Sequence, residues 1–170
     1  MIRVAGLNKN DVVNGEGVSV SLFLQGCPFH CKGCHNPETW NPDGGDAWLE
    51  EDLIQLIIDS IGANGINRNL SILGGETLDT NEKRDFIKSL LQTAKIYYPN
   101  IKIVIWTGYV YEDIKNFENL QDIFSNIDYL IDGPFKIEDR DITLKWRGSR
   151  NQRIIDMKKT LQDKEVKVIS

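Results

Sequence analysis

Residues 18–34, VSVSLFLQGCPFHCKGC, contain the first clear strand pattern of the chain and all three of its cysteines. Over residues 18–24, valine and leucine alternate with serine and phenylalanine, and this period of two is typical of a β-strand. Gly26 interrupts the pattern, and the cysteines follow at once. The sequence therefore predicts a strand that delivers a cysteine loop to its carboxyl end.

The apolar residues further along the chain alternate between helical and strand spacing. They predict, in order, a helix over residues 49–61, a strand over 70–73, a helix over 86–97, a strand over 101–106, a weaker helix over 111–124 and a strand over 128–131. Residues 143–146 suit a further strand, and residues 154–168 suit a helix or a strand equally. The charged residues 158–167 are typical of a solvent-facing tail.

Strands that alternate with helices predict an α/β fold with a parallel sheet, in which ligands bind at the carboxyl ends of the strands. The loops that follow the four clearest strands should then share one face; they cover residues 27–34, 74–76, 107–109 and 132–135. No repeat or linker interrupts residues 1–170, which we expect to form a single domain.

The composition excludes several classes of function. The 170 residues carry 20 basic and 25 acidic side chains, a net charge of -5, which argues against general binding to nucleic acid or an anionic membrane. No apolar stretch approaches the roughly 20 residues of a membrane span, and no secretion signal is visible, so we expect a cytoplasmic protein. A chain of this length buries enough surface to fold without a structural metal.

The cysteine loop points to metal chemistry, because three thiols cannot all pair as disulfides. A structural zinc site would need a fourth ligand, for which His30 and His35 are the candidates. An iron-sulfur cluster held by three cysteines would leave one iron open to a substrate. The spacing favours the cluster over zinc, and inert thiols are a third alternative.

Several motifs together resemble a known family. The three-cysteine loop after the first strand and Gly-Gly-Glu after the second resemble the radical S-adenosylmethionine superfamily. Within it, the chain resembles the activating proteins of anaerobic ribonucleoside-triphosphate reductases. The segments that carry this resemblance are DVVNGEG (11–17), CPFHCKGCHNPETW (27–40), WTGY (106–109), LIDGPF (130–135) and WRGSRNQR (146–153).

The resemblance implies two cofactors and their ligands. Cys27, Cys31 and Cys34 would hold a [4Fe-4S] cluster whose fourth iron binds the amino and carboxylate groups of S-adenosylmethionine. The methionine amino group would meet Gly74, Gly75 and Glu76, and the adenosyl part would lie beside Gly33, Cys34 and His35. No catalytic residue is implied beyond these. The chain departs from the superfamily at Gly33, where many members carry an aromatic residue, and at Thr77, where many carry proline.

The resemblance also implies a fold, an activity and partners. The fold would be a shortened, open (β/α) partial barrel, since four to six strands are too few to close the eight-stranded form. The activity would be reductive cleavage of S-adenosylmethionine to a 5'-deoxyadenosyl radical that generates a glycyl radical on the large subunit of anaerobic ribonucleoside-triphosphate reductase. A flavodoxin-type donor would supply the electron.

Two other functions stay open at this point. One is a radical S-adenosylmethionine enzyme that acts on a small molecule, similar to 7-carboxy-7-deazaguanine synthase, which also has a Gly-Glu-Gly segment before its cysteines. The other is a zinc-stabilised binding module. Arg147, Arg150 and Arg153 form either a solvated edge or a contact for an anion or partner.

Overall fold

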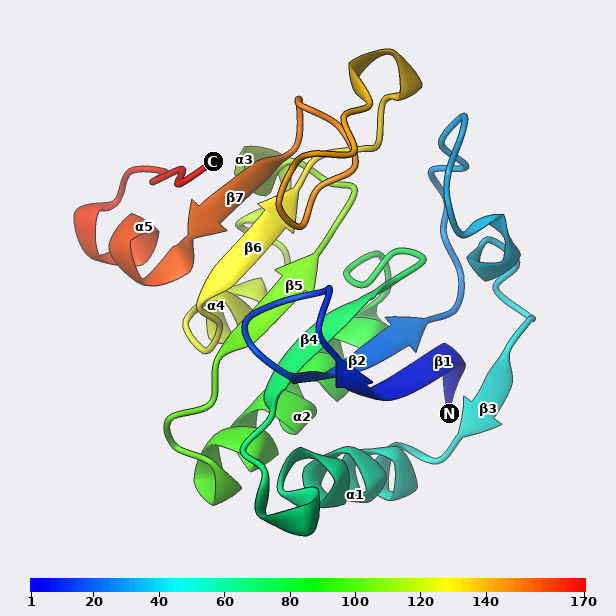
Figure 1. The fold of residues 1–170 in the computed structure, drawn as a ribbon, viewed down its shortest axis with the longest axis vertical. Helices are drawn as coiled ribbons and strands as arrows, with labels where there is room; N and C mark the ends of the chain where they lie inside the picture. Colours follow the sequence, from blue (N-terminus) through cyan, green and yellow to red (C-terminus); the bar gives the residue numbers. More distant parts are fainter.

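The strand predicted at residues 18–24 forms β2 (Ser19–Leu24) of a seven-stranded sheet (Figure 1). The structure is a computed structural model that describes all 170 residues. The other strands are β1 (Ile2–Asp11), β3 (Asp46–Trp48), β4 (Asn69–Gly74), β5 (Ile103–Trp106), β6 (Tyr129–Asp132) and β7 (Arg153–Asp156). The helices are α1 (Glu50–Ile61), α2 (Asn81–Tyr97), α3 (Tyr111–Ile114), α4 (Leu120–Phe124) and α5 (Met157–Asp163), with 3₁₀ turns at Pro37–Thr39, Ala63–Gly65 and Ile137–Asp139.

The sheet has the order β3-β1-β2-β4-β5-β6-β7 and mixes two directions. The predicted strands β2, β4, β5 and β6 are parallel to one another, as expected. Strands β1 and β7 pair antiparallel with β2 and β6, and β3 pairs antiparallel with β1. The expectation of an α/β fold is therefore confirmed, whereas the expectation of an all-parallel sheet is wrong at both edges.

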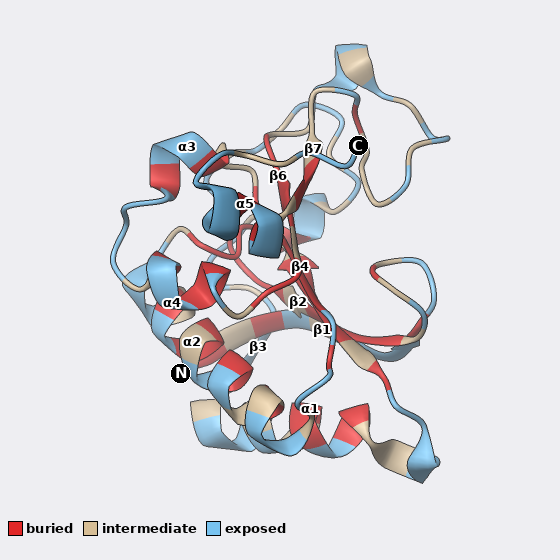
Figure 2. Cartoon of the chain, turned by 90° about the vertical axis from the view of Figure 1, so that its left-hand side faces the viewer, coloured by how far each residue is buried: buried red, intermediate tan, exposed pale blue.

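The main core lies between the sheet and the helices that cover one face of it (Figure 2). Alternate residues of β2, among them Leu22 and Leu24, are completely buried and pack with α1 and α2 in a cluster of 29 buried residues. A smaller cluster of Val104, Ile131 and Ile154 lies on the opposite face, with Trp106 and Trp146 packed against it. Burial of each large apolar side chain stabilises the fold by about 2 kcal/mol, and no cysteine belongs to either cluster.

Three predictions for the second half of the chain need correction. The weak helix over residues 111–124 is two short helices, α3 and α4, because Asn119 adopts a left-handed backbone with φ of 69° between them. Residues 143–146 form turns and bends rather than a strand, and Trp146 also has a positive φ of 60°. The ambiguous segment divides into β7 and α5.

The chain after α5 is not a free tail. Its last residues return to the sheet edge, where Ile155 pairs with Val168 in an isolated bridge and the amide of Ile154 donates to the carbonyl of Ser170. Most charged side chains of residues 158–167 are exposed, as predicted. None of the helices has the length and apolar character needed to cross a membrane.

Candidate cluster and cofactor site

A cavity of about 470 Å³ lies at the carboxyl ends of the parallel strands. In Figure 1 the arrowheads of β4, β5 and β6 point toward this end of the molecule. Residues from all four predicted loops line the cavity, namely Cys27, Cys31, Cys34, His35, Gly74, Gly75, Glu76, Thr107, Gly108, Gly133 and Phe135. The prediction that these loops share one face is therefore confirmed.

The base of the cysteine loop is fixed by backbone hydrogen bonds to the turn at Pro37–Thr39. The amide of Gly26 donates to the carbonyl of Thr39 at 2.7 Å, and the amide of Cys27 donates to the carbonyl of Trp40 at 3.1 Å. Within the loop, the amide of Cys34 donates to the carbonyl of Cys31 at 3.1 Å. All three cysteines are free thiols of intermediate exposure, so each is accessible from the cavity.

Gly33 is required by the geometry of the loop. Its φ of 78° lies in the left-handed region, and a Cβ atom there would come within 2.7 Å of the Ile137 side chain. An aromatic residue would be strained and would collide with this neighbour. The departure from the superfamily pattern at this position therefore has a local steric reason.

The cysteine sulfurs do not form a ready-made site for a single ion. No group of three or more His, Cys, Asp and Glu side chains is close enough together to hold one. Burial, opposed by backbone hydrogen bonds, raises the pKa of the Cys27 thiol. A [4Fe-4S] cluster attaches each cysteine to a different iron, so it suits three thiols that surround one space better than a mononuclear metal does.

Gly74, the last residue of β4, and Gly75 allow close contact with the end of β2 and the start of the cysteine loop. Gly74 has φ of 118°, and a Cβ atom there would lie 2.5 Å from the amide of Leu24. A Cβ atom on Gly75 would lie 2.5 Å from the carbonyl oxygen of Gly26, the residue before Cys27. The sequence Gly-Gly is therefore needed to bring the loop after β4 against the start of the cysteine loop.

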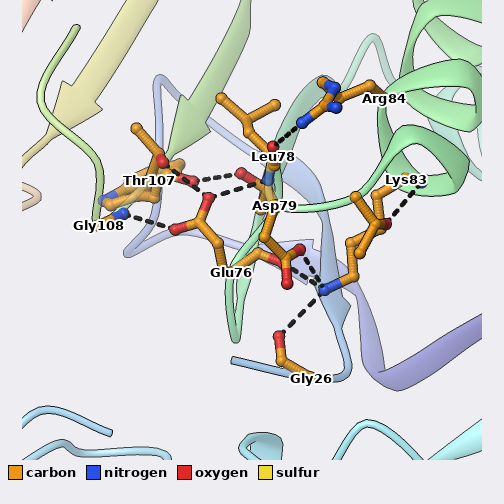
Figure 3. A network of polar contacts seen from close by, with 11 residues as sticks. Gly26, Glu76, Leu78, Asp79, Lys83, Arg84, Thr107 and Gly108 are labelled. Carbon is orange, nitrogen blue, oxygen red and sulfur yellow. Dashed lines mark hydrogen bonds and ion pairs between the residues drawn. The ribbon is translucent and has the colours of Figure 1, made fainter. Parts of the chain in front are cut away.

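The Glu76 carboxylate is held by other parts of the chain (Figure 3). Its side chain is buried and accepts hydrogen bonds from the Thr107 hydroxyl at 2.7 Å, the Gly108 amide at 2.7 Å and the Leu78 amide at 2.9 Å. Two carboxylate oxygens offer about four acceptor positions, and three are used by these donors, so about one position remains for a ligand. Glu76 primarily joins two loops, and its contact with a methionine amino group stays a prediction.

The two histidines lie in different places. His35 lines the cavity and packs at a tilt against Phe135, with ring centroids 5.4 Å apart. His30 stacks on Trp40 at 4.6 Å and lines a second cavity instead. His35 therefore lies at the candidate cavity, where its contact with an adenosyl group stays a prediction, whereas His30 lies outside that cavity.

Two further segments line the cavity, although their place there was not predicted from the sequence. Val13 and Asn14 belong to the DVVNGEG segment, and the region after Phe135 contributes Arg140, Asp141, Ile142, Leu144, Trp146, Arg147, Gly148 and Gln152. Trp146 packs against Tyr129 and also lines the cavity. The DVVNGEG and WRGSRNQR motifs were the only sequence signal for these lining residues, and the spacing of their residues did not indicate a role in the cavity.

Hydrogen bonds connect the Asp-Gly-Pro turn to the WRGSRNQR segment. The side chain of Asn151 donates to the carbonyl of Pro134 at 2.7 Å, and Gln152 donates to the carbonyl of Gly133 at 3.1 Å. The Gln152 side-chain oxygen also accepts from the amides of Gly148 and Ser149. These contacts hold the two motifs against each other beside the cavity.

The three arginines of this segment have separate roles. Arg153 pairs with the buried Asp132 at 2.5 Å and with Glu112 at 2.9 Å, and this hydrogen bonding lowers the pKa of Glu112. Arg147 lines the cavity. The Arg150 side chain is 58% exposed, and its ion pair with Asp139 is long, at 3.5 Å. Arg150 is therefore the most accessible of the three arginines to another molecule.

The comparisons with known proteins agree with the cavity and its thiols. Residues 13–155 match the model of the family described as 4Fe-4S single cluster domain. The chain is 36% identical over 142 residues to the anaerobic ribonucleoside-triphosphate reductase-activating protein of Vibrio cholerae, covering 84% of this chain and 90% of that one. It is 36% identical to the protein of the same name from Enterobacteria phage T4, covering 85% and 87%, and 34% identical to that of Escherichia coli K12, covering 84% and 90%.

The chain therefore belongs to the family of anaerobic ribonucleoside-triphosphate reductase-activating proteins. The match to a 4Fe-4S domain covers all three cysteines, which favours the cluster over the zinc alternative. The resemblance carried by the sequence motifs is confirmed.

Proposed function

We propose that this chain is an activase that cleaves S-adenosylmethionine at a [4Fe-4S] cluster and generates a glycyl radical on anaerobic ribonucleoside-triphosphate reductase. The observation that carries the proposal is that Cys27, Cys31 and Cys34 line the same cavity as Gly74, Gly75 and Glu76. The names of the relatives, activating proteins of anaerobic ribonucleoside-triphosphate reductase, support the identity of the partner.

When bound, the cluster and S-adenosylmethionine would supply one-electron cleavage of the cofactor to methionine and a 5'-deoxyadenosyl radical, which removes hydrogen from the target glycine. The residues of the chain would bind the cluster and orient the cofactor. The three thiolates would hold three irons and leave the fourth to the cofactor. Gly74 and Gly75 permit close backbone approach of the methionine part, while Gly33, Cys34 and His35 would lie beside the adenosyl part.

The cavity wall would also limit side reactions. Trp106, Trp146 and Phe135 provide apolar surface in the cavity, which reduces the access of water to a reactive species. The exposed side chains of Val13 and Ile142 also line it, and they are 72% and 84% exposed. We infer that the reductase covers this rim when its glycine enters.

Three further features belong to the proposal. The open sheet, whose edge strands β3 and β7 are not neighbours, supports a shortened partial barrel of the radical S-adenosylmethionine type. A flavodoxin-type protein would supply one electron for each cofactor cleaved. The chain would act in the cytoplasm, where the reductase makes deoxyribonucleotides without oxygen.

The test is anaerobic reconstitution with iron and sulfide, followed by addition of S-adenosylmethionine and dithionite. We expect 5'-deoxyadenosine, formed slowly without the partner, and a glycyl radical doublet in the electron paramagnetic resonance spectrum once the reductase is added. Absence of 5'-deoxyadenosine from a fully reconstituted protein would contradict the proposal. Consumption of a small pterin-like substrate without a radical on the reductase would favour the synthase-like alternative.

A further inference from the structure

A largely buried ammonium group connects the two loops on which the proposed function depends (Figure 3). The side chain of Lys83, the third residue of α2, is 12% exposed. Its Nζ donates to the carbonyl of Gly26 at 3.0 Å, the carbonyl of Glu76 at 2.7 Å and the carboxylate of Asp79 at 2.9 Å. An ammonium has three donors, so all of them are used.

The two carbonyl acceptors belong to the residues that matter most for the site. Gly26 comes directly before Cys27, and Glu76 ends the Gly-Gly-Glu motif. The Gly26 carbonyl also accepts from the amide of Glu76 at 2.9 Å, so it is bound by one backbone and one side-chain donor. Lys83 therefore lies at the junction of the cysteine loop and the Gly-Gly-Glu loop.

Helix α2 gives this junction a rigid support. Thr80 caps the helix by accepting a hydrogen bond from the Lys83 amide, and Arg84 donates to the carbonyl of Leu78 at 2.7 Å. The apolar face of the helix, including Phe86 and Leu90, is completely buried in the core. The position of Lys83 is thus set by the core rather than by either loop.

Lys83 contacts the loops without lining the candidate cofactor cavity. It lines a second cavity of about 470 Å³, and Cys27 is the one residue that lines both cavities. Lys83 is not among the residues that line the first. Any effect on the cofactor must therefore pass through Gly26, Glu76 or the charge of the ammonium.

We propose that Lys83 is a positioning residue that fixes the cysteine loop relative to the Gly-Gly-Glu loop and stabilises the reduced cluster by its charge. This inference rests on the proposed function, because it concerns the cluster and S-adenosylmethionine. Reduction makes the cluster more negative, and a nearby cation favours the more negative form. Asp79 carries an equal and opposite charge 2.9 Å from Nζ, so loss of the Lys83 ammonium would leave this carboxylate unpaired beside the site.

The experiment compares Lys83→Met with wild type after reconstitution. Both should fold and contain equal iron, since the cysteines are unchanged. In Lys83→Met, about tenfold more S-adenosylmethionine should be needed to change the electron paramagnetic resonance signal of the reduced cluster, because hydrogen bonds to a charged group are lost. The midpoint potential of the cluster should shift to more negative values.

Two variants serve as controls. Lys88→Met removes a lysine from the same helix whose partner Asp122 is 55% exposed, and it should behave as wild type. Lys83→Arg keeps the charge, so its cluster potential should stay near that of wild type even where its cofactor affinity falls. If circular dichroism shows that Lys83→Met does not fold, Lys83→Arg decides by the same two measurements.

The outcomes separate the two proposals. A wild type whose cluster does not respond to S-adenosylmethionine overturns the proposed function and this inference with it. If the wild-type cluster responds, and Lys83→Met has the same affinity for S-adenosylmethionine and the same cluster potential, then only the proposed role of Lys83 is overturned. The role of Lys83 would also be overturned if Lys83→Arg bound S-adenosylmethionine as tightly as wild type but shifted the midpoint potential of the cluster.

Discussion

The hydroxyl of Thr107 donates a 2.7 Å hydrogen bond to the buried carboxylate of Glu76, and this contact joins the loop after β5 to the loop after β4. The backbone of Glu76 contacts the start of the cysteine loop through Gly26. One residue thus connects three of the loops that line the candidate cofactor cavity. Its substitution should affect stability as well as cofactor binding.

Burial outweighs the three hydrogen bonds to Glu76 and raises the pKa of its carboxyl above the ordinary value of 4.5. The folded state then holds this proton more tightly than the unfolded state, so the contribution of Glu76 to stability should fall as the pH rises above about 4.5. Glu76→Gln cannot titrate, and its amide nitrogen cannot accept a hydrogen bond, so we expect it to be less stable by about 1–3 kcal/mol. Urea unfolding across this pH range should show a gap between the two proteins that narrows as the pH rises; a widening gap would contradict the assignment.

Replacement of each ligand cysteine, Cys27→Ala, Cys31→Ala or Cys34→Ala, should abolish assembly of the intact cluster and leave the fold in place. The reason is that neither apolar cluster contains a cysteine. Iron analysis after anaerobic reconstitution and far-ultraviolet circular dichroism measure the two effects. Unfolding of all three variants, or stoichiometric zinc in the wild type, would instead support a structural zinc site.

Gly75→Ala should weaken the binding of S-adenosylmethionine without loss of iron. The added Cβ atom would lie 2.5 Å from the Gly26 carbonyl oxygen, so the two loops must separate. Gly6→Ala is the matched control, because a Cβ atom on Gly6 meets nothing within 4 Å. A cofactor titration that gave equal affinities for both variants would remove the Gly-Gly-Glu loop from the site.

Arg153→Met should destabilise the fold by about 1–3 kcal/mol, because the buried carboxylate of Asp132 loses its cation and keeps only the Tyr111 amide as a donor. Arg150→Met should cost about 0.5 kcal/mol or less, since its ion pair with Asp139 is largely exposed. Thermal or urea unfolding of the two variants measures the difference. Equal losses of unfolding free energy in the two variants would show that Arg153 does not stabilise the buried carboxylate of Asp132.

Arg150→Ala should impair glycyl radical formation on the reductase more than it impairs cofactor cleavage by the activase alone. The exposed guanidinium of Arg150 is accessible to a partner and does not line the cavity. The doublet signal of the reductase and the yield of 5'-deoxyadenosine should be measured on the same samples, with Lys88→Ala as the surface control. Parallel loss of both signals would contradict a partner contact.

The central strands and the long helices were predictable because their apolar residues follow a local period. Strand β1 was missed because its second half, which includes Asn8 and Asn10, is polar and exposed although the backbone pairs with β2. The antiparallel edges arise from long-range pairing, which no local period encodes. The helical period over residues 111–124 was real, but the left-handed backbone at Asn119 divided it.

The candidate site was predictable where topology decides and not where side-chain contacts decide. The rule for parallel strands correctly placed the cysteines beside Gly74, Gly75 and Glu76. It could not reveal that the Glu76 carboxylate already has three donors, nor that Lys83 reaches both loops from α2. These contacts depend on rotamers and on distances between segments far apart in the sequence.

The hydrogen bonds from Gly26 to Thr39 and from Cys27 to Trp40 have a consequence for repair of the protein after oxidative damage. They join the start of the cysteine loop to the turn that follows it by contacts that involve no sulfur atom. The loss of iron would therefore release the ligands without releasing the loop, and most of the ordering entropy of the site would be retained in the apoprotein. We expect the apoprotein to take up iron and sulfide again without refolding.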